Sequence, residues 1–130
     1  MLELIQSIQL IVWVALFIFI LFLFSDKQLW EYEVKFPLTE GVGRGEIEIE
    51  YYKKAKGSID IELELDPNYH NKSLDIFLED IKILNIPADK NTGPRLRLHE
   101  VYTHTEPHEG MIIKIKHNEQ AILFGPLIMD

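Results

Sequence analysis

Residues 46–65 read EIEIEYYKKAKGSIDIELEL and contain the clearest β-strand pattern in the chain. Acidic and apolar residues alternate over Glu46–Tyr51 and again over Ile59–Leu65. A period of two puts every second side chain on the same side of a β-strand, so each segment has one buried and one hydrated face. The polar segment Lys53–Gly57 between them is typical of a turn. The stretch therefore predicts two antiparallel strands joined by a tight connection.

The same alternation extends outward from this hairpin along the rest of the chain. Leu96 and Leu98 alternate with polar residues, and so do Ile113 and Ile115, whereas no helical period occurs after Phe24. We expect eight strands, separated by turns rich in Gly, Pro and Asn, near residues 29–36, 44–53, 57–65, 74–79, 81–86, 95–102, 111–117 and 121–128. Short strands at this spacing predict an all-β fold, an antiparallel two-sheet β-sandwich of seven or eight strands.

The side chains expected to face the interior are mainly Ile and Leu, and they suffice for one core without a metal or a disulfide. They are Ile47, Ile49, Tyr51, Ile59, Ile61, Leu63, Leu65, Leu74, Ile76, Leu78, Ile81, Ile83, Leu96, Leu98, Met111, Ile113, Ile115, Ile122 and Phe124.

The N-terminal residues have a different composition from the rest. Residues 8–24 read IQLIVWVALFIFILFLF without a charge, and a helix from Leu4 to Phe24 would be about 30 Å long, which matches a bilayer core. The basic leader and the small-residue cleavage site of a signal peptide are both missing from this segment. We therefore expect residues 1–25 to form one uncleaved transmembrane helix and residues 26–130 to form the sandwich domain, with membrane lipid as one partner.

The two ends of this helix give conflicting indications about orientation in the cell membrane. Lys27 and Lys35 follow its exit, which favours a cytoplasmic domain by the positive-inside rule. A short N-terminal tail before a single anchor, by analogy with tethered periplasmic β-domains, favours an exported domain. We expect the domain on the extracytoplasmic side of the inner membrane, and the cytoplasmic side is the alternative.

One side of this helix carries polar side chains. Gln6, Gln9 and Trp13 are spaced at i, i+3 and i+7, so they share a face. Amides within lipid form hydrogen bonds to neighbouring helices, which predicts contact with other transmembrane subunits in a hetero-oligomer. The alternative is that these amides lie at headgroup depth and bind water.

The hairpin presents acidic side chains on its hydrated face. They are Glu46, Glu48, Glu50, Asp60, Glu62 and Glu64. Like charges on facing strand positions destabilise a sheet, so something must offset them. Lys114 and Lys116, or Arg95 and Arg97, on an adjacent strand could do so; otherwise a basic partner or a divalent cation could. We expect these six residues to contact a partner.

Composition and motifs exclude several function classes. The net charge of −8 argues against nucleic acid as a main partner, and the absence of Cys excludes disulfides and thiol nucleophiles. No motif of a nucleophile, a zinc protease or a phosphate loop is present, so we expect no enzyme and no cofactor. His99, His104 and His108 lie among carboxylates and could form a copper or zinc site; the alternative is an exposed polar loop.

The order of segments in the second half of the chain resembles that of a known family. Leu74–Leu78 and Asp80–Leu84 are followed by Gly93, a strand over Arg95–Leu98, and the segments Glu109–Ile113 and Ala121–Leu127. This order is similar to small extracytoplasmic β-sandwich domains of the CHRD-like type over residues 58–128. The resemblance implies a sandwich without catalytic activity.

These observations predict a non-catalytic accessory or scaffolding subunit of a multi-subunit membrane complex. It would be anchored by one helix and would contact its partners through the sandwich. The alternative is a membrane-tethered module that binds copper or zinc with the loop from His99 to His108.

Overall fold

The computed structural model describes residues 2–25, 29–53 and 55–130, which form one helix, nine strands and two 3-10 turns. The elements are α1 (Leu2–Ser25), β1 (Leu29–Thr39), β2 (Gly43–Tyr52), β3 (Ala55–Leu65), η1 (Pro67–Tyr69), β4 (Leu74–Leu78), β5 (Ile81–Ile86), η2 (Ala88–Lys90), β6 (Arg95–Tyr102), β7 (Ile112–His117), β8 (Gln120–Pro126) and β9 (Ile128–Met129).

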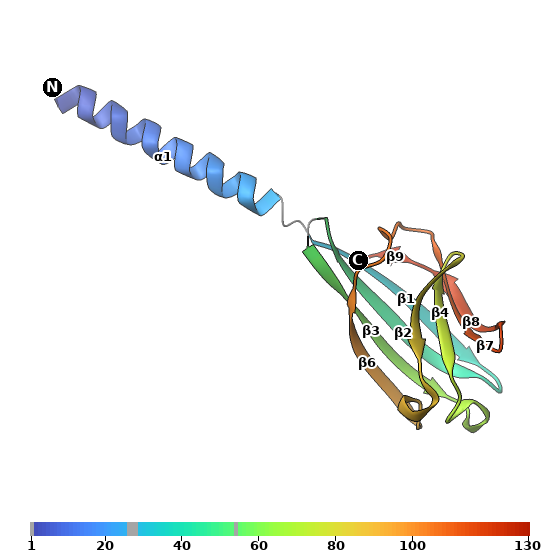
Figure 1. Ribbon diagram of the computed structural model, residues 1–130. Helices are drawn as coiled ribbons and strands as arrows, with labels where there is room; N and C mark the ends of the chain where they lie inside the picture. The colour runs from blue at the N-terminus through green and yellow to red at the C-terminus, as the bar shows by residue number, and fades with distance from the viewer. Residues whose placement is uncertain (1, 26–28, 54) are drawn as a thin grey trace.

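The strands form two antiparallel sheets that lie one over the other (Figure 1). Sheet A has the order β6-β3-β2-β1-β9, and sheet B has the order β5-β4-β7-β8. Within the described residues all eight predicted strands are present, and β9 adds a two-residue strand beside β1. The predicted all-β, two-sheet antiparallel sandwich is therefore confirmed.

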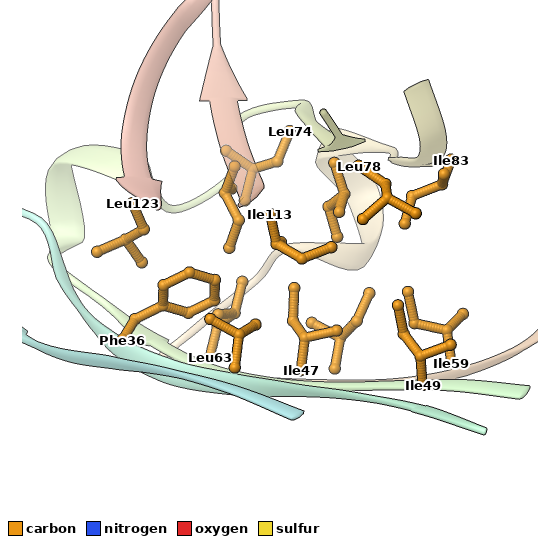
Figure 2. Close-up of a cluster of buried hydrophobic side chains, with 14 of the residues drawn as sticks. Phe36, Ile47, Ile49, Ile59, Leu63, Leu74, Leu78, Ile83, Ile113 and Leu123 are labelled. Carbon is orange, nitrogen blue, oxygen red and sulfur yellow. The ribbon is translucent and has the colours of Figure 1, made fainter. Parts of the chain in front are cut away.

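The core is a layer of aliphatic side chains between the inner faces of the two sheets. Figure 2 shows Ile47 and Ile49 from sheet A facing Leu78 and Ile113 from sheet B. Ile47, Ile49 and Ile113 are 0% exposed, as the alternation in the sequence predicts. Full burial of one such side chain contributes about 1.5–3 kcal/mol, so this layer holds the two sheets together.

The predicted inward residues of β8 are wrong by one position. Leu123 is 3% exposed and Leu127 is 1% exposed, whereas Phe124 is 67% exposed. Ile122 lies where the register with β7 shifts, between the pairs Ile115–Leu123 and Lys116–Ala121, and it is only partly buried. Three consecutive apolar residues carry no period, so the sequence could not define which of them faces inward.

A second predicted core residue is also wrong. Ile81 opens the short strand β5 and is 49% exposed, while Ile83 and Ile86 of the same strand are buried. The register between β4 and β5 shifts between Ile76 and Phe77, and a shift of this kind changes which residues of a strand face inward.

Strand β1 of sheet A and strand β8 of sheet B approach each other closely at Gly125. A Cβ atom on Gly125 would lie 2.9 Å from the Cγ2 atom of Val34, closer than real side chains come. The missing side chain thus permits the close contact between these strands.

One end of sheet A gathers the start of β1, the β2–β3 hairpin, the end of β6 and the C-terminus. Leu29 pairs with Tyr52, Tyr52 pairs with Ala55, and Gly57 pairs with Tyr102. The Asp130 N–H donates to the Glu31 carbonyl at 2.9 Å. We call this the helix-proximal end, because only residues 26–28 separate it from α1 along the chain.

The helix α1 is long and apolar enough to cross a membrane. Its segment Glu3–Leu21 has a mean hydropathy of 2.5, and none of that segment is buried. The predicted boundary between residues 1–25 and 26–130 falls beside residues 26–28, which lie outside the described residues, so this division stays a prediction.

The corrected register of β8 is open to a direct test. Leu123→Ala should lower the free energy of unfolding by about 2–5 kcal/mol, because it leaves a cavity between the sheets. The adjacent Phe124→Ala should change it by no more than about 0.5 kcal/mol, because that ring is exposed. Chemical denaturation of the full chain in detergent, followed by near-UV circular dichroism, measures both. A larger loss for Phe124→Ala would contradict this register.

Candidate interaction surface

The outward face of sheet A carries charged side chains at nearly every position. Strand register arranges them in rows that run across β1, β2, β3 and β6. From the helix-proximal end outward the rows are Glu31–Glu50–Ser58–Val101, Glu33–Glu48–Asp60–His99, Lys35–Glu46–Glu62–Arg97 and Arg44–Glu64–Arg95.

The two rows farthest from the helix-proximal end contain ion pairs. The Nε atom of Arg44 lies 2.8 Å from Glu64 Oε2, and Arg97 Nη2 lies 3.0 Å from Glu62 Oε1. Arg95 Nε lies 3.8 Å from the other oxygen of Glu64. The hydrogen bond and the charge of Arg44 hold the pKa of Glu64 below its usual value. Arg95 and Arg97 therefore do offset the acidic hairpin, as predicted.

The alternative prediction, that Lys114 and Lys116 offset the negative charge of the hairpin, is wrong. Both lysines lie on β7, which belongs to sheet B, so the core separates them from the acidic hairpin. The Nζ atom of Lys116 instead lies 4.3 Å from the centre of the Phe77 ring, at cation–π distance.

His99 is paired with a carboxylate across the strands. Its Nδ1 atom forms a short hydrogen bond with Asp60, the residue opposite it in register. This hydrogen bond, together with the negative charge of Asp60, raises the pKa of the His99 imidazole. The predicted metal ligand is therefore hydrogen-bonded to one of the predicted partner-binding carboxylates.

The other two histidines lie in the loop that follows β6. The His104 ring contacts the Tyr102 ring edge-on, with 5.7 Å between centroids, and the Tyr102 hydroxyl donates to the Thr105 carbonyl. Burial raises the pKa of Tyr102 to about 12, which keeps this donor protonated. Pro107 is buried and separates the exposed His104 from the exposed His108.

The structure thus does not assemble the predicted copper or zinc site from His99, His104 and His108. His99 projects from sheet A toward Asp60, and the other two lie on either side of a buried proline. Across residues 2–25, 29–53 and 55–130, no group of three His, Asp or Glu side chains is placed to hold a metal ion.

The two rows nearest the helix-proximal end are acidic. We call Glu31, Glu33, Glu48, Glu50 and Asp130 the acidic strip. Glu33 faces Glu48 and Glu31 faces Glu50 in register, so like charges stand directly opposite each other. Counting only described residues, neither Glu33 nor Glu48 has a Lys, Arg or His nitrogen within 4.0 Å.

The electrostatic strain of the strip is greatest at Glu48. Burial raises the pKa of the Glu48 carboxyl, and the carboxylates of Glu46, Glu33, Asp60 and Asp130 raise it further. Glu50 accepts a hydrogen bond from the Ser58 hydroxyl at 3.4 Å. Carboxylates arranged in this way can accept hydrogen bonds from ammonium or guanidinium groups on another molecule.

Sequence reasoning found Glu48 and Glu50 but missed the other half of the strip. Glu31 and Glu33 alternate with apolar residues in the first strand, so the signal was present in the sequence. Asp130 joins them only because β9 pairs with β1. No local pattern in the sequence predicts that pairing.

The structure places the predicted polar side of the helix on α1. Gln6, Gln9 and Trp13 all lie within this α-helix, so their spacing puts them on one face. All three are exposed in the isolated chain, and Trp13 is 68% exposed.

Comparison with known proteins informs only the fold. No family model and no curated protein matches the chain. Among solved structures, a point mutant of superoxide dismutase 5 from Candida albicans is similar, with a TM-score of 0.54 and 14% identity over 77% of this chain and 92% of that one. At this identity the likeness supports the β-sandwich alone. The resemblance to CHRD-like domains stays a prediction.

The pair of His99 and Asp60 gives a measurable titration. Asp60→Asn should lower the pKa of His99 toward about 6.5, because it removes the charged acceptor. The pKa of His99 is raised in the folded state. The pair therefore stabilises the fold below about pH 6.5, and this contribution is lost as pH rises through the folded-state pKa of His99. Imidazole resonances followed by NMR report the shift, and those of His108 serve as the internal control. An unchanged His99 titration would show that Asp60 is not its partner.

Burial of the Glu48 carboxyl, together with the repulsion from its acidic neighbours, predicts a stabilising substitution. The raised pKa means that ionised Glu48 destabilises the fold; this penalty is absent below about pH 4.5, grows between there and the folded-state pKa of Glu48, and is fully present above that pKa. Glu48→Gln should therefore raise the melting temperature at neutral pH by about 2 °C. The gain should vanish at about pH 4.

Glu40→Gln, in the exposed β1–β2 turn, is the matched control for thermal unfolding of the full chain in detergent. A neutral-pH gain for Glu40→Gln equal to that of Glu48→Gln would contradict a local repulsion in the strip.

Proposed function

We propose that this chain is a non-catalytic accessory subunit of a membrane protein complex, and that its acidic strip binds a basic surface of a partner protein. The observation that carries the proposal is the facing pair of Glu33 and Glu48, which are like-charged and, among the described residues, have no Lys, Arg or His nitrogen within 4.0 Å. Like charges at facing positions destabilise a sheet. A partner that brings lysine or arginine side chains relieves this repulsion on binding.

The distribution of arginines on the same face supports this choice of surface. Arg44, Arg95 and Arg97 form ion pairs with carboxylates of the far rows, so the larger excess of negative charge remains in the acidic strip. This pairing reduces the set of six acidic residues that the sequence predicts to contact a partner. Asp60, Glu62 and Glu64 are paired with His99, Arg97 and Arg44 on the same face, whereas Glu48 and the added Glu31 and Glu33 would be the carboxylates that a partner contacts.

The helix supplies the second part of the proposal. We infer that α1 is retained as a transmembrane anchor, because its apolar segment suits a bilayer and the flanking residues lack the features of a cleaved leader. Gln6 and Gln9 would form hydrogen bonds with a helix of another subunit, with Trp13 packed beside them. The sandwich would lie on the extracytoplasmic side of the cell membrane.

The assignment as a non-catalytic protein rests on the chemistry of the outer face. Among the described residues, the hollow on this face is lined by carboxylates, Arg97 and His99 with two apolar residues, and its lining has no serine, threonine or cysteine side chain to act as a nucleophile. The fold likeness to a superoxide dismutase carries no activity at 14% identity.

Affinity purification of the full chain from native membranes tests the partner. The tag belongs at the N-terminus, because Asp130 is part of the strip. We expect the full chain to copurify with stoichiometric partner proteins in mild detergent. The double substitution Glu33→Lys with Glu48→Lys should reduce the recovery of these partners at least about fivefold, and high salt should weaken their binding. The control substitution Glu40→Lys changes an exposed residue in the β1–β2 turn, at the other end of β1, and should leave the partner proteins bound. Purification as a monomer without companions would refute the proposal.

A separate experiment tests whether α1 is retained and holds the mature chain in the membrane. We expect the mature chain to keep its N-terminal residues and to remain in the membrane pellet after alkaline extraction. N-terminal sequencing and carbonate extraction measure both properties. A mature chain that begins after Ser25 and is released in soluble form would show that α1 is a signal sequence.

A further inference from the structure

Charges are segregated at the helix-proximal end of the sandwich. The sequence has lysine at three of the four positions 53–56, in a chain of net charge −8, and Lys53 and Lys56 are exposed in the β2–β3 hairpin. Exposed carboxylates of Glu79, Glu106 and Glu109 belong instead to the connections that flank the strands of sheet B. This end therefore has one basic corner.

The length of the chain keeps this corner close to α1. From Ser25 to Leu29 the backbone can span at most about 14 Å, since an extended residue covers at most about 3.6 Å. Leu29 pairs with Tyr52, the last residue of β2, so the β2–β3 hairpin begins one strand spacing, about 5 Å, from Leu29. If α1 spans the bilayer, as the proposed function requires, the lysine-bearing hairpin lies within about 20 Å of the end of α1 and so within reach of the lipid headgroups.

A hollow lies between this hairpin and the end of β6. It measures about 350 Å³, and Tyr52, Lys53, Lys56, Thr103 and His104 are among its lining residues. Ammonium, hydroxyl and imidazole groups thus line the same open depression. Lysine side chains supply point charges that bind phosphate oxygens, and the hydroxyls can donate hydrogen bonds.

The walls of the hollow are held by close contacts. The Tyr102 hydroxyl donates to the Thr105 carbonyl, and the His104 ring packs against the Tyr102 ring. On the hairpin side, a Cβ atom on Gly57 would lie 1.9 Å from the Glu50 carbonyl oxygen, so only glycine fits where the hairpin strands meet. The hollow is therefore part of the folded sandwich and does not depend on a ligand to form.

Aromatic side chains complete the surroundings of the hollow. The rings of Trp30 and Tyr51 lie 6.3 Å apart, and both residues are partly buried against the core. Tyr52 lines the hollow itself. Tyrosine and tryptophan are enriched at the membrane–water interface, where the ring contacts apolar material and its polar atom reaches water.

We propose that the hollow between Tyr52, Lys53, Lys56 and His104 binds the phosphate headgroup of an anionic lipid in the membrane that α1 crosses. Near an anionic surface, each lysine changes the ratio of bound to free states by about fivefold. Tethering by α1 keeps the hollow at the surface, so this modest preference suffices for occupancy.

The lipid contact gives the sandwich a second attachment point. The helix joins the sandwich at one corner of sheet A, and a rigid body attached at one point can rotate about that point. A second contact at the β2–β3 hairpin, on the other side of β2 from β1, restricts that motion. The acidic strip then keeps one orientation relative to the membrane, which lowers the entropy cost of binding a partner there.

The absence of cysteine in the chain makes a site-specific probe straightforward. Val101→Cys places a fluorophore on an exposed position of β6 beside the hollow, and Asn68→Cys places one in η1 at the far end of the sandwich. The full chain is reconstituted in nanodiscs of phosphatidylcholine, with or without phosphatidylglycerol, that contain a headgroup-nitroxide lipid. Quenching by the nitroxide reports how close each position lies to the headgroups.

We expect quenching at position 101 to rise at least about twofold when phosphatidylglycerol is present, and quenching at position 68 to stay unchanged. Lys53→Glu with Lys56→Glu should abolish the rise. Lys53→Gln with Lys56→Gln should reduce it, which keeps the test valid if charge reversal impairs folding. The matched control is Lys114→Glu with Lys116→Glu on sheet B, which changes the net charge equally and should retain the rise.

Equal quenching in both lipid mixtures, or a rise that survives removal of Lys53 and Lys56, would overturn the lipid site. Loss of the rise in the Lys114 and Lys116 variant would show that net charge, rather than the hollow, attracts the membrane. Failure of the full chain to enter nanodiscs would instead refute the anchor on which this inference rests, so the two failures are distinguishable. Partner binding by the acidic strip plays no part in the measurement.

Discussion

The contact between the inner faces of the two sheets is the constraint on which the rest of the structure depends. Ile47, Ile49 and Ile113 are fully buried in it, and each is flanked in sequence by residues that point the other way. Because the period of a strand is two, an apolar inner face requires that the intervening residues form the outer face. Around Ile47 and Ile49 those residues are all glutamates. The same alternation that builds the core therefore also places the carboxylates in rows at strand spacing.

The electrostatics of the outer face follow from which strands lie at its edges. The edge strand β6 brings Arg95, Arg97 and His99 beside the carboxylates of β3. On the other side, β1 and β9 bring Glu31, Glu33 and Asp130. Neutralisation is thus concentrated near β6, and an excess of negative charge remains near β1. This imbalance distinguishes the proposed partner surface from an ordinary solvated sheet face, where opposite charges are interspersed.

The proposals link this charge distribution to the single N-terminal helix. The acidic strip and the lysine-bearing hairpin both lie toward the helix-proximal end, on neighbouring parts of sheet A. An acidic surface is repelled by anionic lipid, whereas the lysine corner is attracted to it. The two features therefore orient the sandwich in the same sense, with the hairpin toward the lipid and the strip available to a protein. A weak lipid contact is enough for this, because α1 has already met the entropic cost of bringing the domain to the surface.

The sequence by itself determined the fold class, the helix and most strand positions, because the alternation in segments such as Ile59–Leu65 and the apolar run of residues 8–24 are local and unambiguous. It also indicated Arg95 and Arg97 as possible partners for the hairpin carboxylates, but it could not choose them over Lys114 and Lys116. That choice depends on which strands share a sheet, which is decided by contacts between residues far apart in the chain.

Only the tertiary structure decided the remaining features. It fixed the inward residue among Ile122, Leu123 and Phe124, because three apolar neighbours carry no period and the register with β7 selects one of them. It paired His99 with Asp60 on sheet A and left His104 and His108 in the loop after β6, so that the described residues contain no group of three metal-ligating side chains. It also joined Asp130 to Glu31 and Glu33 through the β1–β9 pairing. Local patterns set which face a residue prefers, whereas long-range pairing sets which residues meet on that face.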